Sequence, residues 1–209
     1  MVPLSGTSRL SQEALEGAAP TARIAPDRGV SDDPTDAIHE AIDAIAAVEA
    51  REVIELALVR LAAVRRSDDD LERLSALHEG MRECRRTPEA FAEFDFAFHA
   101  TLAAAARNTL LANSLSALHE GMRAMIARFA IAAVAEDRMG DLLDSHLRLL
   151  EAVRRRDPDE AALIVSDMMV LLRIESGRCL PRTTRYVIAR QVPQTGMLQD
   201  RPHKQGDRP

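Results

Sequence analysis

The 209-residue sequence contains no tryptophan, and aromatic residues of all kinds make up only 3% of it. Hydrophobic residues still account for 46% of the chain, and alanine and leucine are prominent among them. A core built from such small aliphatic side chains favours helices over sheets. The length allows one full domain with a core of this kind and leaves room for a small second one.

Cysteines and long apolar runs are also scarce. Cys84 and Cys179 are the only cysteines, which is typical of a reducing compartment rather than of a disulfide scaffold. No segment reaches the roughly 18 consecutive apolar residues of a membrane span, and the first residues do not resemble a secretion signal. We therefore expect a cytoplasmic protein with free thiols and no membrane partner.

Basic residues are fewer than acidic ones, and the formal net charge is −6. The chain as a whole therefore lacks the basic footprint of a dedicated nucleic-acid-binding protein. The segment 179–209 departs from this balance because it combines four prolines with six basic and two acidic residues. We expect this basic tail to be disordered, with a short edge strand over 186–192 as the alternative.

Apolar residues recur at helical spacing between residues 34 and 178, without competing strand-like alternation. Helix starts are marked by capping residues or a first-turn proline, at Asp33-Pro34, Ser67 with Asp70, Thr87-Pro88 and Asp157-Pro158. We predict an all-α fold, an antiparallel bundle of about six to seven helices over 34–178. Residues 1–33 show no such periodicity and predict a largely irregular linker or the remnant of a lost DNA-binding domain.

One stretch, EFDFAFHATL from Glu93 to Leu102, carries an aspartate and a histidine four residues apart within an apolar helix. Asp95 and His99 share a helix face, with Cβ atoms about 5–6 Å apart. His146, on a later helix, is a third residue of ligand type that a bundle can bring to the same interior point. Two interpretations follow: a metal site, or a buried histidine held by an aspartate.

The octapeptide SALHEGMR occurs twice, at Ser75–Arg82 and at Ser116–Arg123. His78 and His119 occupy equivalent positions in the two copies, so a paired metal or proton site is one interpretation. Neither histidine, however, has a second histidine four residues on or a carboxylate three residues before it, as zinc peptidases and di-iron bundles require. We therefore expect both histidines on the helix surface.

Three segments of the chain together resemble the effector-binding FCD domain of the FadR branch of GntR-type bacterial transcription regulators. They are EAREVIELALVRLAAVRR, FDFAFHATLAAAARNTLL and DSHLRLLEAVRRRDPDEAA, and the resemblance covers about residues 37–177. The residues that carry it, in this order and spacing, are Arg51, Glu55, Asp95, His99, Asn108, His146 and Asp157.

The resemblance implies a divalent metal such as zinc, nickel or manganese, held by an aspartate and three histidines, with a small carboxylate effector completing the coordination. The matching ligands are Asp95, His99 and His146, whereas the position of the third histidine aligns with Met168. Because a thioether is a weak ligand for such metals, Met168 either fills the site with apolar volume or leaves three protein ligands. Two histidines and one carboxylate can still hold a metal with open positions.

Two further polar residues are candidates for effector binding. Arg51 can clamp a carboxylate through two hydrogen bonds, or it can form a surface salt bridge. Asn108 can line the same pocket, or it can cap the helix that follows it.

The resemblance also implies a homodimer and a winged helix-turn-helix ahead of the effector domain. Residues 1–33 hold no pair of short amphipathic helices, so we expect this chain to contact DNA only if such a head is supplied elsewhere. The expected function is effector sensing for transcription regulation, without enzymatic activity. The alternatives are a metal-dependent enzyme with a two-histidine, one-carboxylate site, and a helical interaction module without a ligand.

Overall fold

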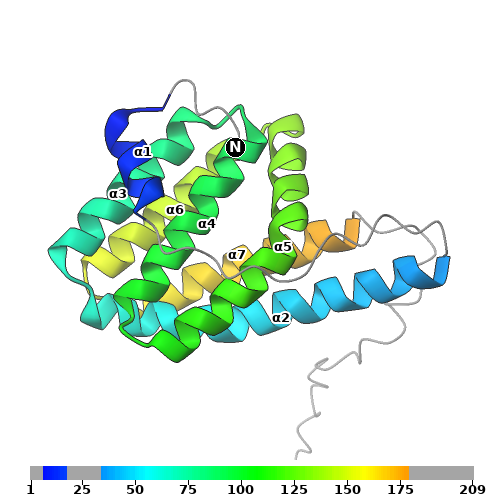
Figure 1. The fold of residues 1–209 in the computed structure, drawn as a ribbon, viewed down its shortest axis with the longest axis horizontal. Helices are drawn as coiled ribbons and strands as arrows, with labels where there is room; N and C mark the ends of the chain where they lie inside the picture. Colours follow the sequence, from blue (N-terminus) through cyan, green and yellow to red (C-terminus); the bar gives the residue numbers. More distant parts are fainter. Residues whose placement is uncertain (1–6, 18–33, 179–209) are drawn as a thin grey trace, which may run out of the picture.

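In the computed structural model, seven helices and no strand form the part of the chain that the structure describes, residues 7–17 and 34–178 (Figure 1). The helices are α1 (Arg9–Glu16), α2 (Pro34–Arg65), α3 (Asp68–Glu83), α4 (Pro88–Ala105), α5 (Thr109–Ala135), α6 (Met139–Arg154) and α7 (Pro158–Arg178). The predicted all-α bundle is confirmed, and α2 to α7 span the expected range 34–178. The basic tail, its alternative strand and residues 18–33 lie outside the described residues.

Two of the predicted caps form, at Ser67 and Asp157, whereas the side chain of Thr87 makes no capping hydrogen bond and Asp33 lies outside the described residues. Ser67 and Asp70 make a reciprocal capping box at the start of α3, and the carboxylate of Asp157 accepts a hydrogen bond from the backbone N–H of Glu160 at 3.0 Å. Proline is the first residue of α2, α4 and α7, where its missing N–H costs nothing. Short connections of this kind make consecutive helices antiparallel neighbours.

Helix α4 lies at the centre of the bundle and contacts α2, α3 and α5. All of its side chains are buried except Pro88, Glu89, Glu93, Ala100 and Ala104. A helix that is apolar around its whole circumference is stable only when other elements cover every side. The polar residues of α4 are therefore carried into the interior together with its phenylalanines.

The neighbours of α4 bring further polar side chains to the same interior. Helices α2 and α7 lie alongside each other (Figure 1), and α6 packs against α7 and α3. Buried polar and charged residues gather where these elements meet: Arg51, Glu55, Asp95, His99, His119 and His146. None of the helices within the described residues is long and apolar enough to cross a membrane.

Helix α1 differs from the irregular N-terminus that the sequence predicts. The Ser8 hydroxyl caps it, and the backbone N–H of Ser8 donates to Glu83 on α3 at 2.7 Å. Ser11 and Ala14 are buried where α1 packs against α3. A helix of eight residues with so narrow a buried face leaves too few apolar positions for periodicity to reveal it.

Candidate functional site

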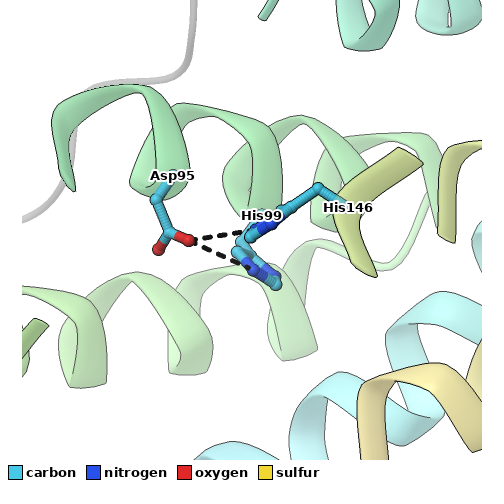
Figure 2. Close-up of side chains that lie close together, drawn as sticks. All are labelled: Asp95, His99 and His146. Carbon is cyan, nitrogen blue, oxygen red and sulfur yellow. Dashed lines mark ion pairs between the residues drawn. The ribbon is translucent and has the colours of Figure 1, made fainter. Parts of the chain in front are cut away.

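The three predicted metal ligands come together in the interior. Asp95 and His99 extend from one face of α4, and His146 reaches them from α6 (Figure 2). All three are buried, and one ligand atom of each lies within 4.8 Å of the others. Asp95 and His99 therefore share one helix face, as their spacing of four residues predicts, and the packing of α6 supplies the third side chain.

The second nitrogen of each histidine fixes how the ring is turned. The Nδ1 atom of His146 lies 2.8 Å from the carbonyl oxygen of Leu142, which can only accept a hydrogen bond. The Nδ1 atom of His99 lies 2.9 Å from a carboxylate oxygen of Glu55. Both rings thus donate through Nδ1, which leaves the lone pair of each Nε2 facing Asp95.

The Nε2 atom of His146 is the most informative atom of the site. It is buried, makes no hydrogen bond with any described group, and lies 3.0 Å from Oδ1 of Asp95. The Nε2 atom of His99 lies 4.0 Å from the same oxygen. Two lone pairs and a carboxylate facing one another in the interior repel unless a proton or a metal ion lies between them.

The donor set fits such a cation. Ligand atoms about 2.0–2.2 Å from a tetrahedral zinc ion lie roughly 3.3–3.6 Å from one another, close to the separations of 3.0 Å and 4.0 Å in the site. The hydrogen bonds from Nδ1 to a carboxylate and to a backbone carbonyl are those that orient histidine ligands in metal proteins. Asp95, His99 and His146 could therefore hold a divalent metal with an open position.

The carboxylates of the site stay ionised despite their burial. Burial by itself raises the pKa of Asp95, but His146, His99 and Arg51 outweigh it and hold the pKa well below its usual range. The pKa of Glu55 is likewise lowered, because Arg51 and the neighbouring imidazoles outweigh burial. Both carboxylates therefore remain negative at neutral pH.

A cavity of about 30 Å³ opens beside these residues, room for about two water molecules. Five of its lining residues are polar or charged: Arg51, Asp95, His99, Ser145 and His146. The others are apolar: Phe91, Ile126, Phe129, Ala130, Leu142, Met168, Met169, Leu171 and Leu172. A largely apolar lining with a few polar groups is suited to a small amphipathic molecule.

The chain matches the FCD domain over residues 46–170, which is more than half of its length. The chain belongs to the FCD-domain family. Its fold is also similar to that of E. coli McbR/YncC, with a TM-score of 0.55 over 81% of this chain and 96% of that chain. Their sequences are 16% identical, so this likeness shows the fold alone.

No curated protein is similar enough in sequence to count as a match. The FCD match supports an effector-binding role in a GntR-family transcription regulator.

The three predicted effector residues of this FCD domain have different positions. Arg51 is 2% exposed and lines the cavity, so the surface salt bridge considered for it is wrong: its partner Glu55 is buried too. Met168 also lines the cavity. Asn108 is not among the cavity-lining residues; its side chain accepts a hydrogen bond from the backbone N–H of Leu111 and caps α5.

Two buried residues beside the FCD site have roles that the sequence did not predict. Glu55 accepts a hydrogen bond from Nε of Arg51 at 2.5 Å and contacts His99 through its other oxygen. His119 is 1% exposed, and its Nε2 lies 3.6 Å from Glu55. The predicted surface position of His119 is therefore wrong, because its face of α5 packs toward α2 and α4. His78 is half-buried and contacts the carbonyl of Leu143.

The signals that could have located these two residues were weak. Glu55 lies four residues after Arg51, which is the spacing of an ion pair on one helix face. His119 was distinguished only by its repeated octapeptide, which says nothing about the partner helix.

Proposed function

We propose that the cavity is the sensor site of a transcription regulator, and that it binds a small organic acid next to a divalent metal held by Asp95, His99 and His146. The observation that carries the proposal is the buried Nε2 of His146, which has no hydrogen-bond partner among the described groups and faces Asp95 at 3.0 Å. A metal there supplies positive charge and an open coordination position. Zinc, nickel and manganese suit the nitrogen and oxygen donors.

The charges of the site support an anionic ligand only when the metal is bound. Asp95 and Glu55 are both negative, and Arg51 is the one buried arginine or lysine beside them among the described residues. These two carboxylates and one guanidinium together carry a charge of about −1, which does not favour a second carboxylate. A divalent ion reverses the sign and makes a carboxylate favourable.

Arg51 supports the same ligand class. Within the described residues its guanidinium makes one hydrogen bond, through Nε to Glu55, while the side chain lines the cavity. Its terminal N–H groups are the edge that binds a carboxylate through two parallel hydrogen bonds. The small volume and the many apolar lining residues favour an acid of few heavy atoms, for which acetate and glycolate are suitable probes.

The first test is the metal content of protein purified without chelators or an affinity tag, measured by elemental mass spectrometry. We expect near-stoichiometric metal in the wild type and its loss in His99→Ala. His78→Leu, a substitution on α3 outside the cavity, is the control and should retain the metal. Absence of bound metal from the wild type, also after incubation with zinc, nickel or manganese, would contradict the metal part of the proposal.

The second test is thermal unfolding of the metal-loaded protein with acetate or glycolate. A ligand that binds only the folded state raises Tm, by about 2.7 kcal/mol of stability at a concentration 100 times its Kd. We expect this rise to disappear in His99→Ala. An unchanged Tm with both acids and with longer carboxylates would argue for a helical interaction module instead.

The family supports an extension of the proposal to regulation. We infer that the domain forms a homodimer whose acid-bound form changes the relation between helix-turn-helix heads supplied outside the described residues. Light scattering of this chain should give twice the monomer mass. A clear shift of its own upstream DNA by this chain would show that the chain contacts DNA directly.

A further inference from the structure

The carboxylate of Glu55 lies between three side chains from three helices. One oxygen accepts from Nε of Arg51 at 2.5 Å, and the other lies 2.9 Å from Nδ1 of His99. The oxygen bound to Arg51 also faces Nε2 of His119 at 3.6 Å. Glu55 is thus connected to a predicted metal ligand and to the predicted carboxylate clamp, with a third donor just beyond hydrogen-bonding distance.

His119 has no function in the structure as it stands. The ring is buried, and neither Nδ1 nor Nε2 has a hydrogen-bond partner among the described groups. Its contacts are edge-on with the rings of Phe96, at 5.1 Å between centroids, and of His99, at 6.3 Å. A buried polar atom without a partner is destabilising, so an apolar residue at this position would make the folded protein more stable. The cost is explained if His119 has a partner in another state of the site.

The N–H of His119 is available for such a partner. An imidazole carries an N–H in either protonation state, and both ring nitrogens of His119 lack an acceptor among the described groups. Glu55 is the nearest acceptor among the described contacts of His119, and a movement of about 0.7 Å would bring 3.6 Å to the usual 2.9 Å. No rearrangement of the helices is needed for a shift of this size.

Binding of an acid supplies the reason for the movement. When a second carboxylate binds Arg51, one guanidinium charge is shared between two anions, and the hydrogen bond from Nε to Glu55 weakens. Glu55 is buried and ionised, so it needs a replacement donor. Besides Arg51 and His99, His119 is the donor group that the described residues place beside it.

We propose that Glu55 exchanges partners when a small carboxylate enters the cavity: Arg51 turns to the acid, and Nε2–H of His119 takes its place on the oxygen of Glu55. His119 is then a positioning residue, which contacts neither the acid nor the metal and stabilises the acid-bound state. This inference rests on the proposed function, because it requires a carboxylate at Arg51.

The test separates acid affinity from metal affinity in His119→Leu and its matched control His78→Leu, the same substitution in the other copy of SALHEGMR. Zinc affinity is measured first by calorimetry, and glycolate affinity is then measured on the zinc-loaded protein. We expect His119→Leu to bind zinc as the wild type does and glycolate about tenfold or more weakly, as loss of a hydrogen bond to a charged acceptor implies. His78→Leu should match the wild type in both.

Two results would overturn the partner exchange and leave the sensor site intact: unchanged glycolate affinity in His119→Leu, or zinc and glycolate affinities that fall by the same factor. Failure of the wild type to bind either zinc or glycolate would instead overturn the proposed function, and the partner exchange with it. The two failures are distinguishable because the wild type still binds zinc and glycolate when only the partner exchange is wrong.

A measurement on the wild type covers the case in which His119→Leu does not fold. In ¹⁵N-labelled, zinc-loaded protein, glycolate should slow the solvent exchange of one imidazole Nε2–H proton and move its resonance downfield, as a new hydrogen bond to a carboxylate requires. The Nε–H resonance of Arg51 should move upfield in the same titration. Bound glycolate with neither change would overturn the proposal.

Discussion

The two copies of SALHEGMR have the same eight residues and the same helical backbone, but the bundle gives their histidines different surroundings. His78, on α3, is half-buried and lies 3.1 Å from the carbonyl oxygen of Leu143. His119, on α5, is buried without a hydrogen-bond partner and faces Glu55 of α2. Identical local sequence therefore fixes the helix, whereas the opposing helices determine what each side chain does.

The methionines of the two copies show which property the repeat does share. Met81 and Met122 are both buried, so each copy directs the same apolar position into the core. The histidine precedes the methionine by three residues and lies on nearly the same helix face. The difference between His78 and His119 then depends on how much of that face the neighbouring helices cover.

The largest expected difference between the copies is in the dependence of stability on pH. Burial lowers the pKa of His119 to about 4, so between pH 6.5 and 4 the unfolded chain binds a proton that the folded chain does not. The stability that depends on a neutral His119 is therefore fully present above about pH 6.5. It is lost as pH falls toward 4, by about 1.4 kcal/mol per pH unit. The pKa of His78 is also lowered by burial, but this half-buried ring contributes less.

Urea unfolding of metal-free protein at pH 7 and pH 4.5, followed by circular dichroism, measures this difference. The wild type should lose about 2–3 kcal/mol more over this interval than His119→Leu does. The curve of His78→Leu should stay close to that of the wild type. Parallel pH curves for the wild type and His119→Leu would show that the folded chain takes up a proton at His119 over the same pH range as the unfolded chain.

The next largest effect comes from the glycine of the first copy. A Cβ atom on Gly80 would lie 2.3 Å from Cε1 of Phe94, a ring in the fully packed core. We expect Gly80→Ala to lower the free energy of unfolding by about 1–2 kcal/mol, because overpacking outweighs the better helix propensity of alanine. Gly140→Ala on α6 is the control, since a Cβ there meets nothing within 4 Å and should leave stability unchanged or higher.

Urea midpoints at pH 7.5 check this pair of variants. A Gly80→Ala protein as stable as the wild type would mean that the ring of Phe94 can move aside and that α3 and α4 approach less closely than they do in the structure.

The difference between local sequence and contacts with opposing helices also explains how much of the molecule the sequence predicts. Helix starts depend on neighbouring residues, so Ser67, Pro88 and Asp157 could be identified from the sequence alone. The pair Asp95 and His99 was predictable for the same reason, since a spacing of four fixes a shared helix face. The resemblance to the FCD domain then indicated His146 as their partner.

The rest of the site could not be predicted because it depends on contacts between distant segments. The role of Glu55 depends on α2 lying against both α4 and α5, which no local pattern encodes. His119 was assigned to the surface because its octapeptide has no metal-binding spacing, although burial is decided by the helices opposite. Asn108 shows the reverse case: its local capping function, one of two alternatives, is the one that the structure contains.

A smaller effect separates the two histidines at neutral pH, where both are uncharged. His78→Leu removes the hydrogen bond to Leu143 and should lower stability by about 1 kcal/mol. His119→Leu removes two buried polar atoms without partners and should leave stability unchanged or raise it by up to about 1 kcal/mol. Urea unfolding at pH 7.5 without ligand measures both, and a loss of stability in His119→Leu would show that its ring has a partner already in the ligand-free protein.

The smallest difference is expected between the arginines that end the two copies. Arg82 is exposed and pairs with Glu79 one turn earlier on the same helix, so Arg82→Ala should leave the urea midpoint unchanged. Arg123 instead joins two helices, since it donates to Glu93 on α4 at 2.6 Å and lies 4.9 Å from the ring centroid of Phe96. The contact of Arg123 holds two helices together and includes an aromatic ring, whereas that of Arg82 is an exposed pair within one helix. Arg123→Ala should therefore lower the free energy of unfolding by about 0.5–1 kcal/mol. The part due to the ion pair should weaken in high salt and the part due to the ring should not. Equal midpoints for the two variants at low salt would mean that the packing of α5 on α4 does not depend on this arginine.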